Sequence, residues 1–235
     1  LTPAMDMYPA IANGTSIIQG KRTKAGEVCE MEIELSGSGD QQNAIQGASY
    51  LQDIGDWYNK NVTGSMIIQG RMLRDIRLGS KNNPVIISIS SLTLSNCVSL
   101  QRLLLSNITT LSGTLNLTAC EHLQEIYADG TSLAQIVLPS GGGLRVVEYS
   151  RFNQYLSLSN YPLLTDDGIG IDLCKTVISD FFIVDCALVR PMKILVDIMN
   201  AQMEQGDNHA LKRIRAVGFE ESYNNSFILD KLVDL

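Results

Sequence analysis

The most reactive side chains in this chain are its cysteines and two histidines, His122 and His209. Cysteine and histidine bind zinc and form nucleophile–base pairs, and both uses require recognised spacings between the residues. Neither histidine lies at a recognised catalytic spacing from a cysteine, a serine or a carboxylate. His122 follows Glu121 in a segment expected to be a turn, which favours a solvated side chain.

The five cysteines are Cys29, Cys97, Cys120, Cys174 and Cys186. An odd number without any Cys-x-x-Cys pair favours neither a disulfide framework nor a zinc site. Free cysteine is among the most buried residue types in proteins. We therefore expect these residues to be buried, reduced structural thiols.

Phosphate-binding and metal-binding motifs are also missing from the sequence. The chain has no Walker-type glycine loop, and Gly168-Ile-Gly170 lacks the third glycine and the preceding strand of a dinucleotide loop. The carboxylate pairs Asp166-Asp167 and Asp53/Asp56 are of a kind common on acidic surfaces, and they lack EF-hand spacing. The sequence thus predicts no catalytic, cofactor-binding or metal-binding residue and no enzymatic activity.

Five Asn-x-Ser/Thr sequons invite two interpretations. They begin at Asn13, Asn61, Asn107, Asn116 and Asn224. In a eukaryotic ectodomain they would indicate glycosylation. In a repeat protein, the same residues satisfy backbone groups at turns, and this second interpretation is the one we favour.

Composition limits the classes of partner. Of the 235 residues, 45% are hydrophobic and 18% charged, as in a globular chain, and the net charge is −7. No basic stripe indicates nucleic-acid binding, and no apolar run is long enough to span a bilayer. No signal peptide is visible. The chain begins with Leu1 and stops at Leu235 within an apolar pattern, so we expect it to be a piece of a longer polypeptide.

A leucine-rich pattern recurs in the middle of the chain. Segments starting at Leu94, Leu117, Leu138 and Leu158 align without gaps, at spacings of 23, 21 and 20 residues. Cys97 and Cys120 occupy the same position of this pattern. Spacings of 20–29 residues are typical of leucine-rich repeats, which bury their apolar side only by stacking into a solenoid. The fold class predicted is therefore a β-rich leucine-rich-repeat solenoid.

Two short strands per coil explain a second, shorter period. Between residues 85 and 190 apolar alternations recur every 9–12 residues, and alternation indicates strands. We expect one strand on each side of a flattened coil. The turns between them are expected at Asn96, Asn107, Asp129-Gly130, Gly141-Gly-Gly143 and Asn160.

The flanking segments predict further elements. Before the repeats, residues 28–35 indicate a strand and residues 48–58 a short helix, while 73–78 already have the leucine-rich form. After them, helices are expected at 191–204 and 227–235, with a strand at 211–216 between them. The apolar stripe of the first helix is expected to pack on the solenoid, and it comprises Met192, Leu195, Val196, Met199 and Met203.

Two regions follow from these patterns. Residues 1–60 are expected to form an N-terminal cap or small β module, and residues 61–235 a right-handed solenoid with helices on its larger C-terminal coils. The end near 227–235 is expected to contact another chain or the remainder of this one, so that the isolated chain self-associates. The surface expected to bind a partner is the strand-lined face carrying Arg102, Glu125, Tyr127, Glu148 and Tyr149.

Three runs carry a resemblance to a known group of proteins. They are residues 47–56, residues 123–131 with Leu138-Pro139 after them, and residues 226–232. These runs resemble leucine-rich segments of large structural proteins of gut bacteriophages, the crAss-like phages and their relatives, over roughly residues 45–235. The resemblance implies a virion component of the tail or its fibres, with other subunits or a host-surface receptor as partners.

Two alternatives remain open at this point. Secreted or cell-surface bacterial adhesion proteins are built from the same kind of coil, and so are domains attached to carbohydrate-active or protease-associated enzymes. The resemblance supplies no catalytic motif to transfer onto this chain.

Overall fold

A computed structural model describes residues 8–11, 16–21, 30–35, 42–46, 53–55, 57–59, 62–171, 176–204 and 210–218. Its side chains are described from Ile54 onward. The predicted helix at 227–235 lies outside these residues, and so do Cys29, Cys174 and His209. The expected contact of the C-terminal end with another chain therefore stays a prediction.

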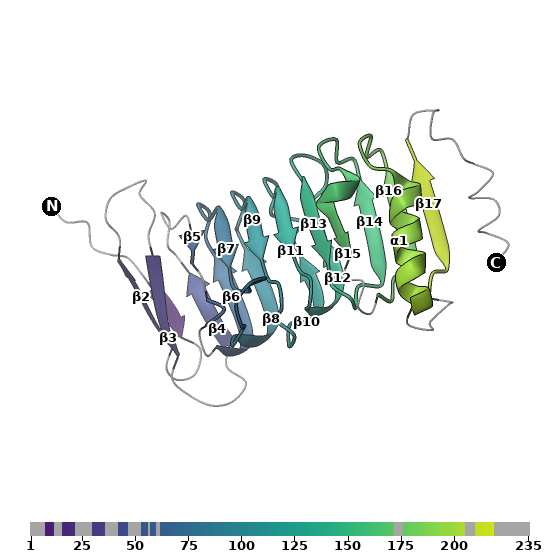
Figure 1. The fold of residues 1–235 in the computed structure, drawn as a ribbon. Coiled ribbons are helices and arrows are strands. Elements are labelled where there is room, and N and C mark those ends of the chain that lie inside the picture. The colour runs from purple at the N-terminus through teal and green to yellow at the C-terminus, as the bar shows by residue number, and fades with distance from the viewer. Residues whose placement is uncertain are drawn as a thin grey trace.

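The chain winds into a β-solenoid of about five stacked coils (Figure 1). One side of each coil before the last described one contributes a short strand to a six-stranded parallel sheet, here called the first sheet. Its strands in spatial order are β5 (Asp53–Ile54), β7 (Asp75–Arg77), β9 (Arg102–Leu104), β11 (Glu125–Tyr127), β13 (Val146–Tyr149) and β15 (Ile169–Ile171).

The other side of the coils, here called the second face, forms three separate groups of parallel strands. The first group contains β4 (Gln42–Gln46), β6 (Thr63–Gln69) and β8 (Ser88–Ser95), the second β10 (Ser112–Asn116) and β12 (Ser132–Val137), and the third β14 (Tyr155–Ser159), β16 (Asp180–Val184) and β17 (Arg213–Val217). The prediction of two strands per flattened coil is confirmed, as is the strand predicted at 211–216.

A column of aliphatic side chains runs through the first sheet. The register places Ile76, Leu103 and Ile126 in neighbouring strands, and Val147 and Ile169 continue the column. Leu103, Ile126 and Val147 are 0% exposed. The prediction that these three residues form adjacent rungs is confirmed. Because each coil buries its apolar side only against its neighbours, this column is the core that holds the coils together.

The turns lie where the residue types predict them. Asn96, Asn107 and Asn160 have φ between 54° and 65°, and Gly130 and Gly141 also have positive φ. Asparagine and glycine are the residues that adopt this left-handed conformation most readily. Asn107 also donates a hydrogen bond from Nδ2 to the Ser80 carbonyl at 3.0 Å, which ties two successive turns together. This contact is the backbone-satisfying role expected of asparagine here.

The N-terminal strands include antiparallel pairs. β1 (Tyr8–Ile11) pairs with β4, and β2 (Ser16–Lys21) pairs with β3 (Glu30–Leu35), which confirms the described part of the strand predicted at 28–35. Parallel pairing already includes β4 and β5, on the N-terminal side of residue 61. The helix predicted at 48–58 is wrong in its described part, because Ile54 pairs with Ile76 as a strand of the first sheet.

The last described coil carries the helix α1 (Pro191–Glu204), which matches the predicted bounds. The predicted packing stripe is confirmed for Leu195, which is buried, and for Met192 and Met199, which pack against the core. It is wrong for Val196 and Met203, which are 46% and 64% exposed. The fully buried residues of the helix are Pro191, Ile194, Leu195, Ile198, Ala201 and Gln202. Among the described helices, none is long and apolar enough to span a membrane.

Candidate binding surface on the first sheet

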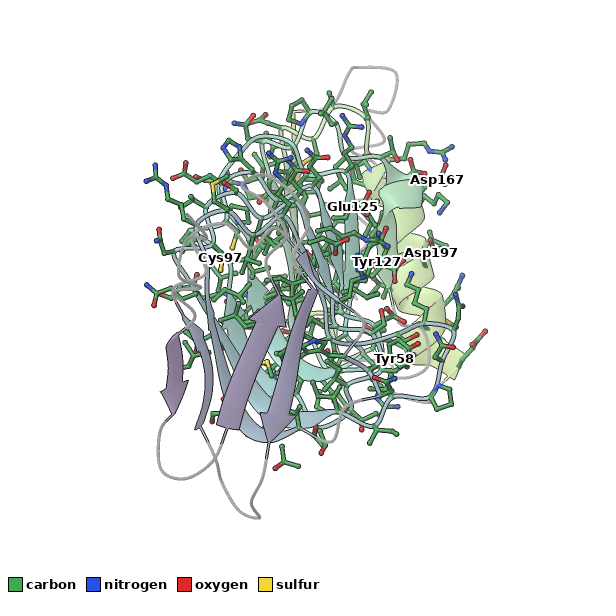
Figure 2. All side chains as sticks on the ribbon, turned by 90° about the vertical axis from the view of Figure 1, so that its left-hand side faces the viewer. Tyr58, Cys97, Glu125, Tyr127, Asp167 and Asp197 are labelled. Carbon is green, nitrogen blue, oxygen red and sulfur yellow. The ribbon has the colours of Figure 1, made fainter. Side chains whose placement is uncertain are left out.

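The outward positions of the first sheet, together with Lys81 from a turn beside it, carry a group of interacting charged and aromatic side chains. We call this group the outer polar cluster: Lys81, Arg102, Glu125, Tyr127 and Glu148. Strand alternation places the four strand residues, because the residue between Glu125 and Tyr127 points into the core as Ile126. Figure 2 shows Glu125 and Tyr127 toward the side of the molecule where α1 lies, with Cys97 toward the opposite side.

Arg102 and Glu125 are register partners on adjacent strands. The Arg102 Nε and Glu125 Oε2 atoms lie 3.5 Å apart. Tyr127 donates a hydrogen bond from its hydroxyl to the same Glu125 oxygen at 3.0 Å. The Arg102 guanidinium also lies over the Tyr127 ring, 5.7 Å from its centroid. One carboxylate therefore orients both a cation and a phenol on the surface.

A second cation approaches Tyr127 from the turn after β7. Lys81 Nζ lies 4.5 Å from the centroid of the Tyr127 ring and also donates to Glu148 Oε1. Glu148 extends over Gly170 on the next strand, where a Cβ atom would lie only 2.7 Å from Glu148 Cγ. The glycine thus makes room for the Glu148 side chain. Tyr127 interacts with two cations, an arrangement that cation–π attraction favours.

Partial burial alters the acid–base behaviour of the cluster. It raises the pKa of Tyr127 to about 12, and the hydrogen bond to Glu125 acts in the same direction. Burial also raises the pKa of Glu148, a hydrogen bond with Asp129 adds to this rise, and Lys81 opposes it. Tyr127 is therefore a neutral hydrogen-bond donor throughout the physiological range. The cluster offers paired charges and an aromatic ring to a partner.

Tyr149 does not belong to this surface, and its predicted outward position is wrong. It is 1% exposed, and it follows Glu148 directly in β13. Because consecutive strand residues point to opposite faces, Glu148 and Tyr149 cannot both face solvent. Tyr149 instead points inward, two residues after Val147, as Leu105 does two residues after Leu103.

The surface predicted from the sequence did not include Lys81 or Asp129, which interact with its residues. Lys81 lies in a turn and is 67 residues from Glu148 in sequence, so no local pattern connects them. Asp129 accepts a hydrogen bond from Ser106 Oγ at 2.6 Å and so lies at the rim of the same face. Both occupy turns that stack because the strands before them stack, and the repeat alignment is the only sequence signal for that proximity.

The cysteines lie apart from this surface, in the turns that follow strands of the second face. Cys97, Cys120 and Cys186 are buried and free, which confirms the prediction for these three. The Cys97 thiol donates to the Ile68 carbonyl of the preceding coil at 3.6 Å. Burial raises the pKa of each thiol, and that of Cys120 to about 12. Such thiols are poor nucleophiles because the thiolate is disfavoured.

The remaining candidates for chemistry have other surroundings. His122 is exposed in its turn, as predicted, and Asn116 is exposed on β10. The description of Asp166 as a surface carboxylate is wrong, because it is 6% exposed and forms an ion pair with Arg190 at 2.5 Å. This ion pair joins the short 3-10 helix η1 (Asp166–Gly168) to the start of α1. Within the described residues, no group of three or more His, Cys, Asp or Glu side chains is arranged to hold a metal ion.

No protein-family model, curated protein or solved structure matches this chain.

Proposed function

We propose that this chain is a non-enzymatic solenoid that acts as a spacer and docking surface, in a bacteriophage virion and within its tail or tail fibres. The observation that supports a spacer is the unbroken column from Ile54 to Ile169, which joins successive coils through parallel pairing. Stacked coils of this kind resist bending because each inner coil is fixed by two neighbours. The resemblance of residues 45–235 to phage structural proteins supports the virion as the location.

The outer polar cluster is the docking surface in this proposal. Arg102 and Glu125 keep 45% and 36% of their side-chain surface exposed, although they are paired with each other. An exposed ion pair contributes little to folding stability, so it is available to exchange partners on binding. Tyrosine and arginine are also enriched at the centres of protein interfaces.

Mass spectrometry of purified virions tests the location. A structural component is expected at a fixed stoichiometry relative to the capsid protein, in particles purified to constant composition. Detection on the surface of uninfected bacterial cells and absence from particles would instead support the adhesion protein.

A charge reversal tests the docking surface. The double variant Arg102→Glu/Glu125→Arg keeps the ion pair but inverts the pattern presented to a partner, whereas Thr93→Ala on the second face is the matched control. We expect assembly or receptor binding to be reduced about tenfold or more by the double variant and to be unchanged by the control. Unchanged binding in the double variant would remove this face from the proposal.

A further inference from the structure

The second face is interrupted between β12 and β14, two strands that are described in full. β12 pairs with β10, and β14 pairs with β16, but no ladder joins β12 to β14. A single backbone hydrogen bond, from Gln154 N to Ala134 O at 3.0 Å, connects the two strands near their beginnings. Beyond it, two strand edges that run in the same direction face each other without pairing.

A cavity of about 550 Å³ opens between these edges. We call it the slot. β12 forms one wall, β14 the other, and the turn after β12 closes one end. The polar side chains at the slot are neutral, including Gln135, Tyr155, Ser157, Ser159 and Asn160. No charged residue is among those that line it.

Tyr161 reaches across the gap between the two coils. In four other coils, the equivalent turn residue accepts a backbone hydrogen bond from the residue three positions later, and these residues are Gly70, Cys97, Cys120 and Cys186. Tyr161 makes the same bond with Leu164, so a tyrosine stands where the other coils have a cysteine or a glycine. Its side chain is 4% exposed and donates from the hydroxyl to the Pro139 carbonyl at 2.6 Å.

The two ends of the slot are therefore bridged differently. At one end β12 and β14 meet backbone to backbone, and at the other the length of a tyrosine side chain lies between Tyr161 and Pro139. A buried thiol at this turn does not by itself produce pairing, because β8 and β10, which precede Cys97 and Cys120, are also without a ladder. Between β12 and β14 the tyrosine side chain occupies the open end, and peptide groups of both edges are without a strand partner.

We propose that the slot binds an extended peptide segment of a partner protein, inserted as an additional strand between β12 and β14. Two facing strand edges offer backbone donors and acceptors on both sides of an inserted strand, and this pairing is how peptides bind by strand addition. β14 has five residues, which corresponds to about 16 Å of extended chain. The neutral lining favours an uncharged segment.

The floor of the slot sets the side-chain preference of the peptide. Ile136 and Tyr161 line the cavity and are 7% and 4% exposed, so the space below an inserted strand is already filled. Alternate residues of the peptide point toward this floor and must be small, such as alanine or glycine. The outward residues meet Tyr155 and the serines of β14. A neutral oligosaccharide would suit those side chains too, but it would leave the strand edges unpaired.

Binding of a defined peptide tests the proposal on the unaltered chain. The probe is acetyl-Thr-Ala-Thr-Ala-Thr-amide, and its control is the same peptide N-methylated at two consecutive residues, which removes one N–H donor toward each wall. We expect the probe to shift the NMR amide signals of β12 and β14 and to slow their hydrogen exchange. The N-methylated control should bind about tenfold more weakly or worse.

The variant Tyr161→Cys tests the role of Tyr161 in the slot. It removes the side chain that reaches the Pro139 carbonyl across the open end, so β12 and β14 should approach each other and binding of the probe should be lost. Thr93→Ala, on the exposed side of β8, is the matched control and should bind as the unaltered chain does.

Several results would overturn the proposal. They are unchanged spectra at millimolar probe, equal binding of the N-methylated peptide, full binding by a folded Tyr161→Cys variant, and shifts of these amides by maltotetraose but not by the peptide. The N-methyl comparison decides the matter even where Tyr161→Cys fails to fold. The slot lies on the second face, so its failure would leave the outer polar cluster and the virion location untouched.

Discussion

Residues at equivalent positions of successive coils have different sizes and different roles. Cys97, Cys120 and Cys186 are small, buried and hydrogen-bonded or packed within the turn, whereas the Tyr161 hydroxyl at the same position donates to the Pro139 carbonyl of the preceding coil. In the first sheet, Val147 fills the rung next to Ile126 with one methylene fewer. Single side chains at one repeat position thus differ in the contacts they make between coils.

The buried thiols should resist alkylation. At pH 8 in the native protein, we expect iodoacetamide to leave Cys97, Cys120 and Cys186 unmodified, because burial limits access and the raised pKa values disfavour the thiolate. Peptide mass spectrometry measures this, with the urea-unfolded chain as the control in which all three react. Rapid modification of Cys120 in the native state would contradict its buried position.

Ile126 should tolerate only apolar replacement. Ile126→Asp places a carboxylate at a position with 0% exposure and should lower the free energy of unfolding by several kcal/mol, about 3 or more. Ile126→Val should cost only about 1 kcal/mol. Thr114→Asp, exposed on β10, is the charge control and should have little effect. Urea unfolding measures the free energy of unfolding of all three variants. Similar losses for Ile126→Asp and Thr114→Asp would argue against the buried column of the first sheet.

Glu148 should make stability depend on pH. A raised folded-state pKa means that the folded chain binds the proton more tightly than the unfolded chain. The stabilisation from this proton is present below the ordinary pKa of 4.5 and is lost as the pH rises from 4.5 through the higher folded value. Urea unfolding of the unaltered chain and of Glu148→Gln across this window should show a shallower decline in the variant. An equal or steeper decline would exclude Glu148 as the source.

At the scale of elements, α1 replaces a strand of the first sheet in the last described coil and presents two different faces. Ile194, Leu195 and Ile198 pack on the solenoid, while Val196 and Met203 are exposed. Gln202 fixes the end of the helix by donating from Nε2 to the Ile178 carbonyl at 2.9 Å. The ion pair of Asp166 with Arg190 fixes its start. The helix is therefore held at both ends and along one side.

A pair of aspartate substitutions separates the two faces of α1. Ile198→Asp should destabilise the chain by several kcal/mol, because Ile198 is 0% exposed. Val196→Asp should change stability by about 0.5 kcal/mol or less, because this side chain is 46% exposed. Thermal or urea unfolding of both variants makes the comparison. The reverse order would show that the methionine-rich stripe is the packed one.

At the scale of the whole molecule, the described coils form one stack in which backbone pairing joins neighbouring coils (Figure 1). A coil in the middle is covered on both sides, and a coil at the end of the stack on one side. Stability in such a chain is a sum of coil and interface contributions, so local opening is easiest at the ends.

Hydrogen exchange should reveal this gradient. The amides of β9, β11 and β13 should exchange slowest, and those of β17, which pairs on one side with β16 alone among the described strands, should exchange faster. Exchange followed by NMR or mass spectrometry on the unaltered chain measures the order. Uniform protection along the stack would indicate a single cooperative unit instead.

The sequence by itself determined the coil. Turn positions at Asn96, Asn107 and Asn160, the alternation around Ile126, and the bounds of α1 all follow from local preferences, because backbone conformation and strand alternation act over a few residues. The 20–23-residue recurrence can be found in the sequence because each coil repeats the same local pattern. The prediction that Glu148 and Tyr149 share the surface was wrong, because strand alternation places consecutive residues on opposite faces.

The tertiary structure decided which residues meet across coils. Lys81 reaches Glu148, Arg190 reaches Asp166, and Ile54 pairs as a strand although its segment has helical spacing. The slot lies between β12 and β14, and the Tyr161 side chain of one coil reaches the Pro139 carbonyl of the other across it. Such spacing belongs to the packed stack, because packing sums contributions from residues that are remote in sequence.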